Sequence, residues 1–365
     1  MSATATDSVT ASPIGERLRI AWLAYRGNPN SGGQGVYTRY VTKELVDMGH
    51  EVTVFGGPPY PNLDERVPLV KIASLDLYRQ PDPFRVPKLA EFTSSIDALE
   101  FALMCTAGFP EPLTFSLRAR KALADRRADF DIVHDNQCLG QGLLGMLADG
   151  WPLVATLHHP ITVDRDLELA HARTPWRKMT FRRWYGFLRM QARVARQLPR
   201  IITVSQSSRA DSAEQMGLDA DRIAVVPVGV DHLRFRPLPH IERVPGRLMT
   251  TASADVPLKG LVPLLEALAK VRTERHAELV VVGMPRPQTR VGETISRLGL
   301  AGAVRFLSGV SDERIVEEYA KAEVAVVPSL YEGFSLPAVE AMACGVPPIA
   351  VNAFGPAEII ESGRT

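Results

Sequence analysis

The sequence predicts an α/β protein of two domains, each with a parallel sheet between layers of helices. Strand-like apolar runs alternate with helix-like segments along most of the chain, which is the pattern of βαβ units. Several prolines and mixed charges interrupt the alternation at 229–245 and indicate a linker. The length of 365 residues also fits two domains, at roughly 150 residues each. We therefore expect an N-terminal domain over 16–232 and a C-terminal domain over 246–365.

The N-terminal domain opens with a predicted βαβ unit. An apolar run at 19–24 leads into a glycine-rich loop and then into helical spacing over 36–48. Gly49 is placed to end this helix, and 51–55 reads as the second strand. Residues Gly32, Gly33 and Gln34 lie in the loop between strand and helix, where backbone can approach a ligand closely and free amides can face an anion. A simple tight turn explains the same glycines, so the loop alone does not identify a site.

The rest of this domain is regular only in part. Residues 58–130 show little periodicity, apart from a helical patch at 87–103. Four β-rich runs of buried-strand type follow, at 130–134, 153–158, 201–205 and 223–226. Apolar residues at helical spacing predict one long helix over 176–198.

A second alternation of strands and helices builds the C-terminal domain. The predicted strands are 248–252, 278–283, 304–307, 324–328 and 348–351. The predicted helices are 260–272, 290–298, 312–321 and 337–343. Because no short period recurs, a solenoid is excluded.

Composition excludes several classes of protein. The net charge of +1 gives no general attraction to nucleic acid, and 45% hydrophobic with 23% charged residues excludes wholesale disorder. Three scattered cysteines provide neither a disulfide framework nor a metal cluster, and they fit a reducing compartment. No apolar run approaches the roughly 18 residues of a membrane helix, and the N-terminal stretch lacks the pattern of a signal peptide. We expect a cytoplasmic protein.

The densest group of candidate residues lies at 332–340. Glu332 is placed in the loop after a predicted strand, and Glu340 lies one turn inside the helix that starts near Pro337. Two carboxylates without this context would be interpreted as solvated surface charges. Here they flank a loop whose amides are free to bind phosphate or sugar oxygens. Those amides belong to Gly333, Phe334, Ser335 and Leu336.

This region resembles the family-4 retaining glycosyltransferases of GT-B fold. Their Glu-x7-Glu signature matches Glu332 and Glu340 within EGFSLPAVEAMACGVP. The other matching segments are SGGQGVYT (31–38), LHH (157–159), VPVGVD (226–231), PLKG (257–260) and FGPAEII (354–360). The resemblance implies two Rossmann-like domains that face each other across a cleft. In the family the chain continues past this last motif with a further strand and helices, so we expect a C-terminal domain that lacks its final helices.

The resemblance also assigns roles. It implies that Glu340 binds the nucleotide ribose, that Glu332 lies near the donor sugar, and that Lys259 pairs with the diphosphate. His158 would meet the donor sugar near its primary hydroxyl, with His159 as the adjacent alternative. The backbone of 333–336 would contact sugar hydroxyls and diphosphate.

Two positions depart from the family pattern. The family places an Arg five or six residues before the Lys, where this sequence has Ala254 and Ser253. Ser253 can donate a hydrogen bond but brings no charge, so either another basic residue substitutes or the diphosphate is bound more weakly. Val228 stands where the family often has Asn.

The implied function is transfer of a hexose, glucose or mannose, from a UDP- or GDP-sugar to a hydroxyl of a saccharide, lipid or small-molecule acceptor. The nucleotide sugar is a substrate, and neither a cofactor nor a metal is expected, because amides and basic side chains do the metal's work. The Asp-x-Asp sequences at 129–131 and 164–166 are therefore read as coincidental. A nucleotide-sugar epimerase or sugar phosphorylase of the same fold remains an alternative, as does a non-catalytic nucleotide-sugar-binding protein.

A basic segment covers 173–200, with nine Lys or Arg and no acidic residue. It admits two interpretations. It is either a peripheral contact for an anionic membrane or acceptor, or a core-packed helix with a basic solvent face.

Overall fold

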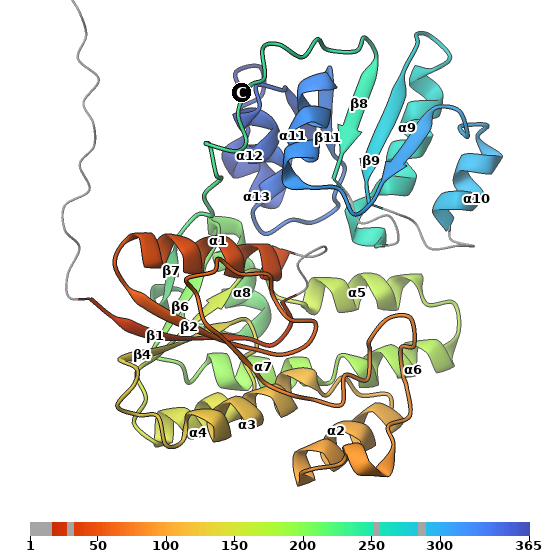
Figure 1. The fold of residues 1–365 in the computed structure, drawn as a ribbon. Helices are drawn as coiled ribbons and strands as arrows, with labels where there is room; N and C mark the ends of the chain where they lie inside the picture. The colour runs from red at the N-terminus through yellow and green to blue at the C-terminus, as the bar shows by residue number, and fades with distance from the viewer. Residues whose placement is uncertain (1–16, 28–32, 252–255, 284–289) are drawn as a thin grey trace, which may run out of the picture.

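The computed structural model describes residues 17–27, 33–251, 256–283 and 290–365. It contains two parallel sheets flanked by helices, one above the other in Figure 1. The predicted α/β class with two Rossmann-like units is therefore confirmed. The domain limits of 16–232 and 246–365 remain predictions from the sequence.

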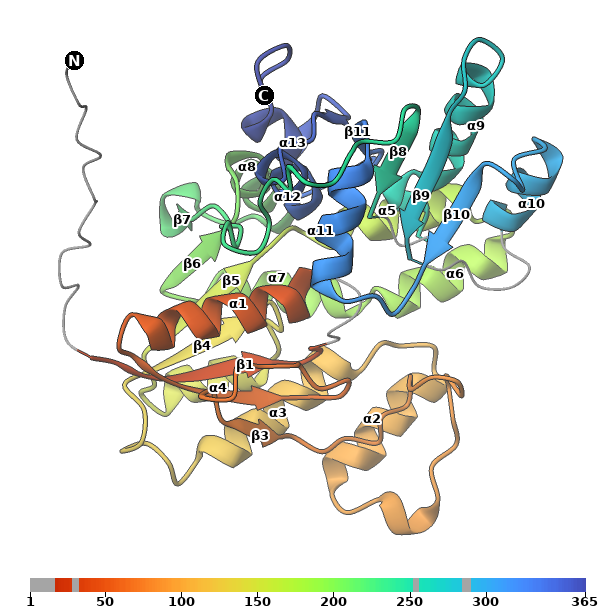
Figure 2. The ribbon, with the colours of Figure 1, turned by 45° about the horizontal axis from the view of Figure 1, so that its top comes forward.

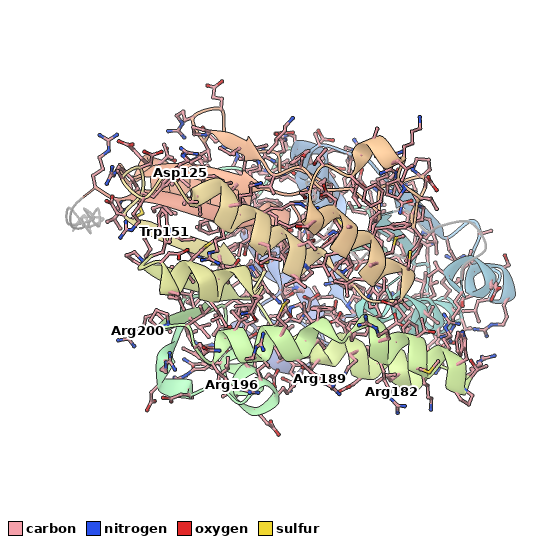
Figure 3. All side chains as sticks on the ribbon, turned by 90° about the horizontal axis from the view of Figure 1, so that it is seen from below. Asp125, Trp151, Arg182, Arg189, Arg196 and Arg200 are labelled. Carbon is pink, nitrogen blue, oxygen red and sulfur yellow. The ribbon has the colours of Figure 1, made fainter. Side chains whose placement is uncertain are left out.

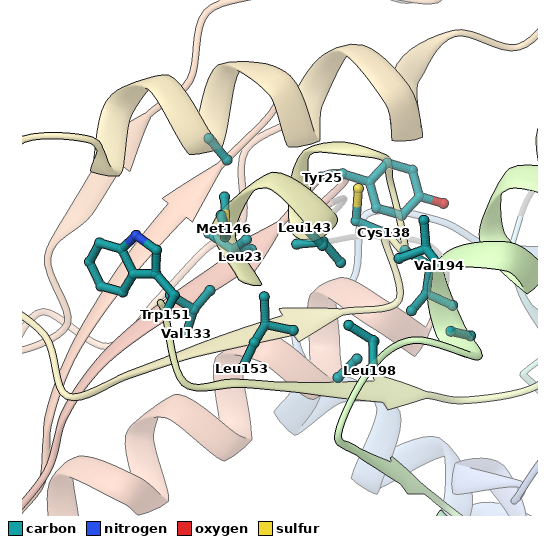
Figure 4. Packing of buried hydrophobic residues seen from close by; sticks show 14 of the residues in the cluster. Leu23, Tyr25, Val133, Cys138, Leu143, Met146, Trp151, Leu153, Val194 and Leu198 are labelled. Carbon is teal, nitrogen blue, oxygen red and sulfur yellow. The ribbon is translucent and has the colours of Figure 1, made fainter. Parts of the chain in front are cut away.

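The first sheet has seven strands in the order β3-β2-β1-β4-β5-β6-β7. Its strands are β1 (Arg19–Ala24), β2 (Glu51–Gly56), β3 (Leu69–Lys71), β4 (Ile132–Asn136), β5 (Leu153–Leu157), β6 (Arg200–Thr203) and β7 (Ile223–Val225). Helices cover both faces of this sheet, and successive strand residues point to opposite faces, so each strand contributes to two cores. In β1, Leu23 joins the core beneath α3, α4 and α7, whereas Trp22 joins the core beneath α1. Figure 4 shows the first of these cores, with Leu143, Met146 and Leu198 around Leu23.

Eight α-helices are described in this domain. They are α1 (Gly33–Asp47), α2 (Ser95–Cys105), α3 (Glu111–Leu123), α4 (Gly142–Ala148), α5 (Thr162–His171), α6 (Pro175–Trp184), α7 (Phe187–Ala195) and α8 (Gln206–Met216). The helical patch predicted at 87–103 is shifted toward α2, because Ser94 and Asp97 form a capping box that starts the helix there. The expectation of little regularity at 58–130 was wrong for α3, which starts with Pro112 in its first turn.

The single helix predicted over 176–198 is also wrong, because the chain forms α6 and α7 there. Helix α6 has no buried residue, whereas α7 buries Leu188 and Val194 in the core. The N–H of Tyr185 closes α6 on the carbonyl of Phe181, and Gly186 then begins the next helix. The apolar spacing continues across both helices, so it did not reveal that α6 is exposed whereas α7 packs on the core.

The second sheet has five parallel strands in the order β10-β9-β8-β11-β12. They are β8 (Arg247–Thr250), β9 (Glu278–Val282), β10 (Val304–Leu307), β11 (Val324–Val327) and β12 (Pro348–Ala350). The helices are α9 (Leu261–Val271), α10 (Arg290–Arg297), α11 (Asp312–Lys321), α12 (Leu336–Ala343) and α13 (Phe354–Ile359). No described helix is long and apolar enough to cross a bilayer.

The two domains touch through α13 and α8, which lie together in Figures 1 and 2. Glu358 in α13 accepts hydrogen bonds from the backbone N–H groups of Gln206 (2.9 Å) and Ser207 (2.6 Å) at the start of α8. A carboxylate is favourable at a helix N-terminus, where amides are unpaired. A second polar link joins α1 to α11, where Arg39 pairs with Asp312 at 3.5 Å. Arg234 of the linker pairs with the same carboxylate.

Candidate active site

The loops after β5 and β11 meet between the two sheets. Gly333, in the loop after β11, lies so close to β5 that a Cβ there would stand 2.5 Å from the His158 carbonyl oxygen. The buried Ser208 hydroxyl lies between the two loops, 2.9 Å from the His158 carbonyl oxygen and 3.2 Å from that of Gly333. Residues 175 positions apart in the chain thus share one site, at the carboxyl ends of parallel strands where α/β proteins bind ligands.

His158 is held in one orientation by its neighbours. Its Nε2 is 2.7 Å from Asn136 Oδ1, and its backbone N–H donates to Gln137 Oε1 at 2.8 Å. The Asn136 amide donates to the Gln34 carbonyl and the Thr38 hydroxyl, so its oxygen is the atom that faces His158. We therefore assign the hydrogen to Nε2, which leaves Nδ1 as an acceptor.

Burial lowers the pKa of His158 to about 3. The imidazole is therefore neutral at pH 7, and it can exchange hydrogen bonds but supplies no positive charge. The Tyr37 ring packs edge-on against it, with centroids 4.6 Å apart. The adjacent His159 faces another way, with Nε2 3.3 Å from Asp164 Oδ2.

The glycine-rich loop joins the same site through Gln34, whose carbonyl accepts from Asn136 at 3.2 Å. Gly33 begins α1, and a Cβ there would meet no atom of the described residues within 4 Å. Gly32 and Ser253 lie outside the described residues.

Glu332 and Lys259 form an ion pair across the second domain. Glu332 Oε1 accepts from Lys259 Nζ and from Ser329 Oγ, each at 2.7 Å. Gly260 makes this approach possible, because it has φ +65° and any Cβ would stand 1.9 Å from the Pro328 carbonyl oxygen. The two candidate residues, 73 positions apart, are therefore adjacent.

The loop before α12 is strained and partly unsatisfied. Ser335 has φ +96°, a conformation that L residues seldom adopt, and its buried Oγ has no partner among the described residues. Phe334 is buried beside it, and Leu336 opens the helix. A strained loop with a free hydroxyl at a helix start is the arrangement expected where backbone amides must face a ligand.

Glu340 lies in α12 and is partly buried. Burial, together with the negative charge of Asp312, raises its pKa to about 7, and a hydrogen bond with Tyr319 opposes the shift. Its carboxylate is thus poorly compensated inside the protein. Hydroxyl donors from a ligand would stabilise the charged form.

Sequence reasoning missed the residues that support the site. Asn136 and Gln137 orient His158, Ser208 joins the two loops, and Gln137 itself has φ +56°. The available signal was a polar residue that ends a buried strand, Asn136, followed directly by a second one, Gln137. No signal in the sequence indicated Ser208, because its hydrogen-bond partners, the carbonyl groups of His158 and Gly333, lie far away in the chain.

Neither Asp-x-Asp sequence is arranged to ligate a metal. Asp131 is paired with Arg19 at 2.6 Å, and Asp129 with Arg126 at 2.8 Å. Asp164 faces His159, and Asp166 faces Arg165 at 2.7 Å. Within the described ranges, no three His, Cys, Asp or Glu residues gather into a group that could hold a metal ion.

Comparisons with known proteins agree with this geometry. Residues 31–234 match the model of Glycosyltransferase Family 4, and 242–365 match that of Glycosyl transferases group 1. The MMP alpha-(1->4)-mannosyltransferase of Mycolicibacterium hassiacum is 53% identical over 344 residues, which are 94% of this chain and 83% of that protein.

Two solved structures share the fold at lower identity. Sucrose-phosphate synthase from Thermosynechococcus elongatus superposes with a TM-score of 0.66 at 21% identity, over 93% of this chain and 82% of that one. Anabaena HepE, in complex with UDP and glucose, gives a TM-score of 0.65 at 19% identity, over 95% of this chain and 84% of that one.

Proposed function

The chain belongs to Glycosyltransferase Family 4 and is a glycosyltransferase of GT-B fold, and from this premise we propose that it transfers mannose from a nucleotide-diphosphate sugar to a saccharide hydroxyl. The observation that carries the proposal is the meeting of His158 with the Gly333 loop, beside the pair formed by Lys259 and Glu332. Mannose is favoured over glucose by the mannosyltransferase at 53% identity. We take GDP-mannose as the first donor to test and UDP-glucose as the second.

Donor binding is assigned to the second domain. Glu340 would accept hydrogen bonds from both ribose hydroxyls, while the amides of 333–336 and the Lys259 ammonium would face the diphosphate. The leaving nucleoside diphosphate gains negative charge as the glycosidic bond breaks, so fixed donors at that place stabilise the transition state more than the ground state. HepE, of the same fold, holds UDP and glucose in its structure.

The reaction is proposed to retain configuration at the anomeric carbon. The C1–O bond to the β-phosphate breaks, the acceptor oxygen bonds to C1 from the same face, and the acceptor proton passes to the departing phosphate oxygen. Glu332 is engaged by Lys259 and Ser329, so it is not placed as a free nucleophile. Neutral His158 would position the sugar through a hydrogen bond.

No metal ion is required in this proposal, because Lys259 and the helix amides supply the charge stabilisation. The test is transfer activity in EDTA, which should leave the rate largely unchanged. A rate restored only by added divalent ions would contradict this part of the proposal.

The decisive experiment is a donor and acceptor panel analysed by NMR. GDP-mannose with a mannose oligosaccharide should give a product with an α-linked mannose and one equivalent of GDP. Conversion of the donor without acceptor would indicate an epimerase, and dependence on inorganic phosphate would indicate a phosphorylase. Binding without turnover across the panel would indicate a non-catalytic binding protein.

The two helices of the basic segment at 173–200 fit different interpretations: α7 is a core-packed helix, whereas α6 is exposed and could contact a membrane. Helix α7 packs Leu188 and Val194 inward, while Figure 3 shows Arg182, Arg189 and Arg196 along the outer edge of α6 and α7, with Arg200 beyond them at the start of β6. Helix α6 instead exposes Trp176 (72%) and Met179 (51%). We propose that any peripheral membrane contact uses α6. Liposome flotation with anionic lipid tests it, and no retention at low salt would exclude it.

We place the reaction in the cytoplasm. Cys105, Cys138 and Cys344 are all free thiols, and Cys105 is exposed. An exposed free thiol suits a reducing compartment.

A further inference from the structure

We propose that a cavity between α5, α7 and α8 of the first domain binds a small phosphate monoester, and that its occupancy raises the rate of transfer. We call it the α7 cavity, and its volume is about 310 Å³. This is the lower end of the range for small-molecule sites, roughly 300–1,000 Å³. Binding to the cavity is independent of the proposed function, whereas the effect on the rate rests on it.

Helix α7 supplies much of the cavity wall. Arg189, Ala192 and Arg196 line the cavity, and their spacing of three and four residues places them on one face of the helix. Arg165 of α5 adds a third guanidinium group to the lining. Figure 3 shows Arg189 and Arg196 on the outer edge of α7. Three positively charged side chains therefore surround one cavity.

The positive charge of this wall is compensated only in part. None of the described residues that line the cavity is Asp or Glu. Arg165 pairs with the exposed Asp166 at 2.7 Å, and Arg196 donates from Nε to the Met216 carbonyl at 2.9 Å. Arg189 is exposed, and its guanidinium group has no partner among the residues that the structure describes. Guanidinium groups in this state favour an anion, and they suit the oxygens of phosphate.

The rest of the lining favours a phosphate ester over the inorganic ion. Gln215 Oε1 accepts a hydrogen bond from the Thr162 hydroxyl, which leaves the amide N–H groups of Gln215 as donors for a ligand. Leu157, Leu188 and Met216 are buried and form an apolar part of the wall. The phosphate group of a monoester offers oxygens to the guanidinium groups, and its organic part would cover the apolar wall.

The cavity lies behind His158 and is separate from the candidate active site. Leu157 ends β5 and packs into the core beneath α7. The next residue, His158, faces Asn136 and packs against the Tyr37 ring of α1. A ligand in the α7 cavity therefore leaves the side of His158 that faces α1 unoccupied.

Hydrogen bonds connect the cavity to His158. Gln191 lines the cavity and is 2% exposed, and its Nε2 donates to the carbonyl groups of Cys138 (3.0 Å) and Gln137 (3.4 Å). The side chain of Gln137 accepts from the His158 N–H and donates to the His159 carbonyl, each at 2.8 Å. Gln191 and Gln137 thus link the cavity wall to the turn that carries both histidines.

The position of α5 determines the direction of the effect. This helix begins at Thr162, shortly after the two histidines. A phosphate bound by Arg165 of α5 and Arg189 of α7 would bridge the two helices and restrict the turn between β5 and α5. Because reacting groups held in one geometry react faster, occupancy should raise kcat.

Isothermal titration calorimetry with glucose 6-phosphate tests the binding, and glucose is the uncharged control. Arg189→Gln should weaken binding by about tenfold, the effect of losing one hydrogen bond between charged groups. Arg182→Gln removes the same charge from exposed α6, outside the cavity, and should bind as wild type. No binding by wild type, equal losses in both variants, or binding that saturating GDP abolishes would overturn the site.

Vesicles of phosphatidylcholine with phosphatidic acid, whose headgroup is a phosphate monoester, distinguish the source of the phosphate. Binding of glucose 6-phosphate without flotation on these vesicles would support a soluble ester. Flotation that depends on Arg189, without binding of glucose 6-phosphate, would support the phosphate site and assign it to a lipid headgroup.

Transfer rates with and without glucose 6-phosphate test the effect on turnover. At saturation kcat should rise about fivefold or more, the lower end of ordinary coupling between sites. Gln191→Leu should still bind the ester and lose this rise, because it removes the donor to Gln137.

Binding without a rise in kcat, or a rise in which the ester is itself glycosylated, would overturn the coupling and leave the site. A protein that binds the ester through Arg189 but transfers no hexose would contradict the proposed function alone.

Discussion

The carboxyl group of Glu340 has a pKa near 7, so donor binding should depend on pH in the neutral range. A raised carboxyl pKa means that the folded protein holds the proton until the pH exceeds that value, and only the ionised form accepts two ribose hydroxyls. The donor KM should therefore fall as the pH rises, by up to about tenfold between roughly pH 6 and pH 8. Initial rates at varied donor concentration across this range provide the measurement.

Glu340→Gln is the control for this dependence, because it removes the titrating group and keeps the shape. The KM should become flat with pH and rise by ~10- to 100-fold at pH 8, since a hydrogen bond to a charged group contributes roughly 1.5–3 kcal/mol. A variant that keeps the wild-type profile would remove Glu340 from the ribose site.

Substitution of Lys259 tests whether its ammonium group stabilises the leaving diphosphate. Lys259→Ala should lower kcat by about 10²- to 10³-fold, the range for loss of one charge-stabilising donor, and should weaken nucleotide diphosphate binding at the same time. Lys270→Ala, on the exposed side of α9, is the matched control. Steady-state rates and GDP titration measure both effects, and normal values of both in Lys259→Ala would contradict the assignment.

At the residue scale, the sequence indicated residues that the structure brings together at the candidate site, Glu332 beside Lys259 and Gly333 beside His158, but not the side chains that orient them. Glu332, Glu340 and Lys259 were found because a motif has fixed local spacing. Asn136, which fixes His158, was not, because its partners lie 22 and 102 positions away. Contacts at such separations depend on the register of packed elements, which local spacing does not specify.

At the scale of elements, the parallel strands of both sheets were predictable because each is a short, fully buried apolar run. The helices around 95–123 and 162–195 were predicted less well. Helix α6 has no buried residue, and the apolar spacing at 176–198 continues into α7, so the spacing does not mark where α6 ends. Helix α6 and the loop after β3 were thus the least visible in the sequence, because their rings at Trp184, Tyr78 and Phe84 contact one another rather than the core.

The loop before α12 provides a prediction about packing between elements. In Gly333→Ala, the new Cβ would meet the His158 carbonyl oxygen at 2.5 Å, so the loops after β5 and β11 must separate. Because the clash involves backbone, flexible side chains cannot relieve it. Transfer should fall by about tenfold or more, since small misplacements of reacting groups are costly.

Gly302→Ala is the matched control, because a Cβ at Gly302 meets nothing within 4 Å. Both variants should keep the wild-type melting temperature to within about 2 °C, since neither disturbs a core. A Gly333→Ala enzyme with full activity would show that the two loops need not touch during turnover.

For the whole molecule, the closed arrangement depends on polar contacts rather than on a shared core. Tyr331 in the second domain donates to Asp211 at 2.7 Å, and Ser208 bridges two carbonyl groups across the interface. The hydrophobic clusters stay within their own domains. Domains joined in this way can separate at low cost, which suits the proposed reaction, in which a nucleotide sugar enters and a nucleotide leaves.

Glu358 is the contact that should set this equilibrium, because its carboxylate caps α8 from the other domain. Loss of a capping carboxylate costs about 0.5–2 kcal/mol, so Glu358→Ala should shift the domains toward an open form and raise the donor KM by ~2- to 30-fold. Small-angle scattering should show a larger radius of gyration without ligand, and saturating GDP should restore the wild-type value. Glu361→Ala, which removes only an exposed pair with Arg364, is the control and should change neither quantity. If Glu358→Ala raised the KM with unchanged scattering, the residue would act on the donor directly; if it changed neither, the α13–α8 contact would not govern closure.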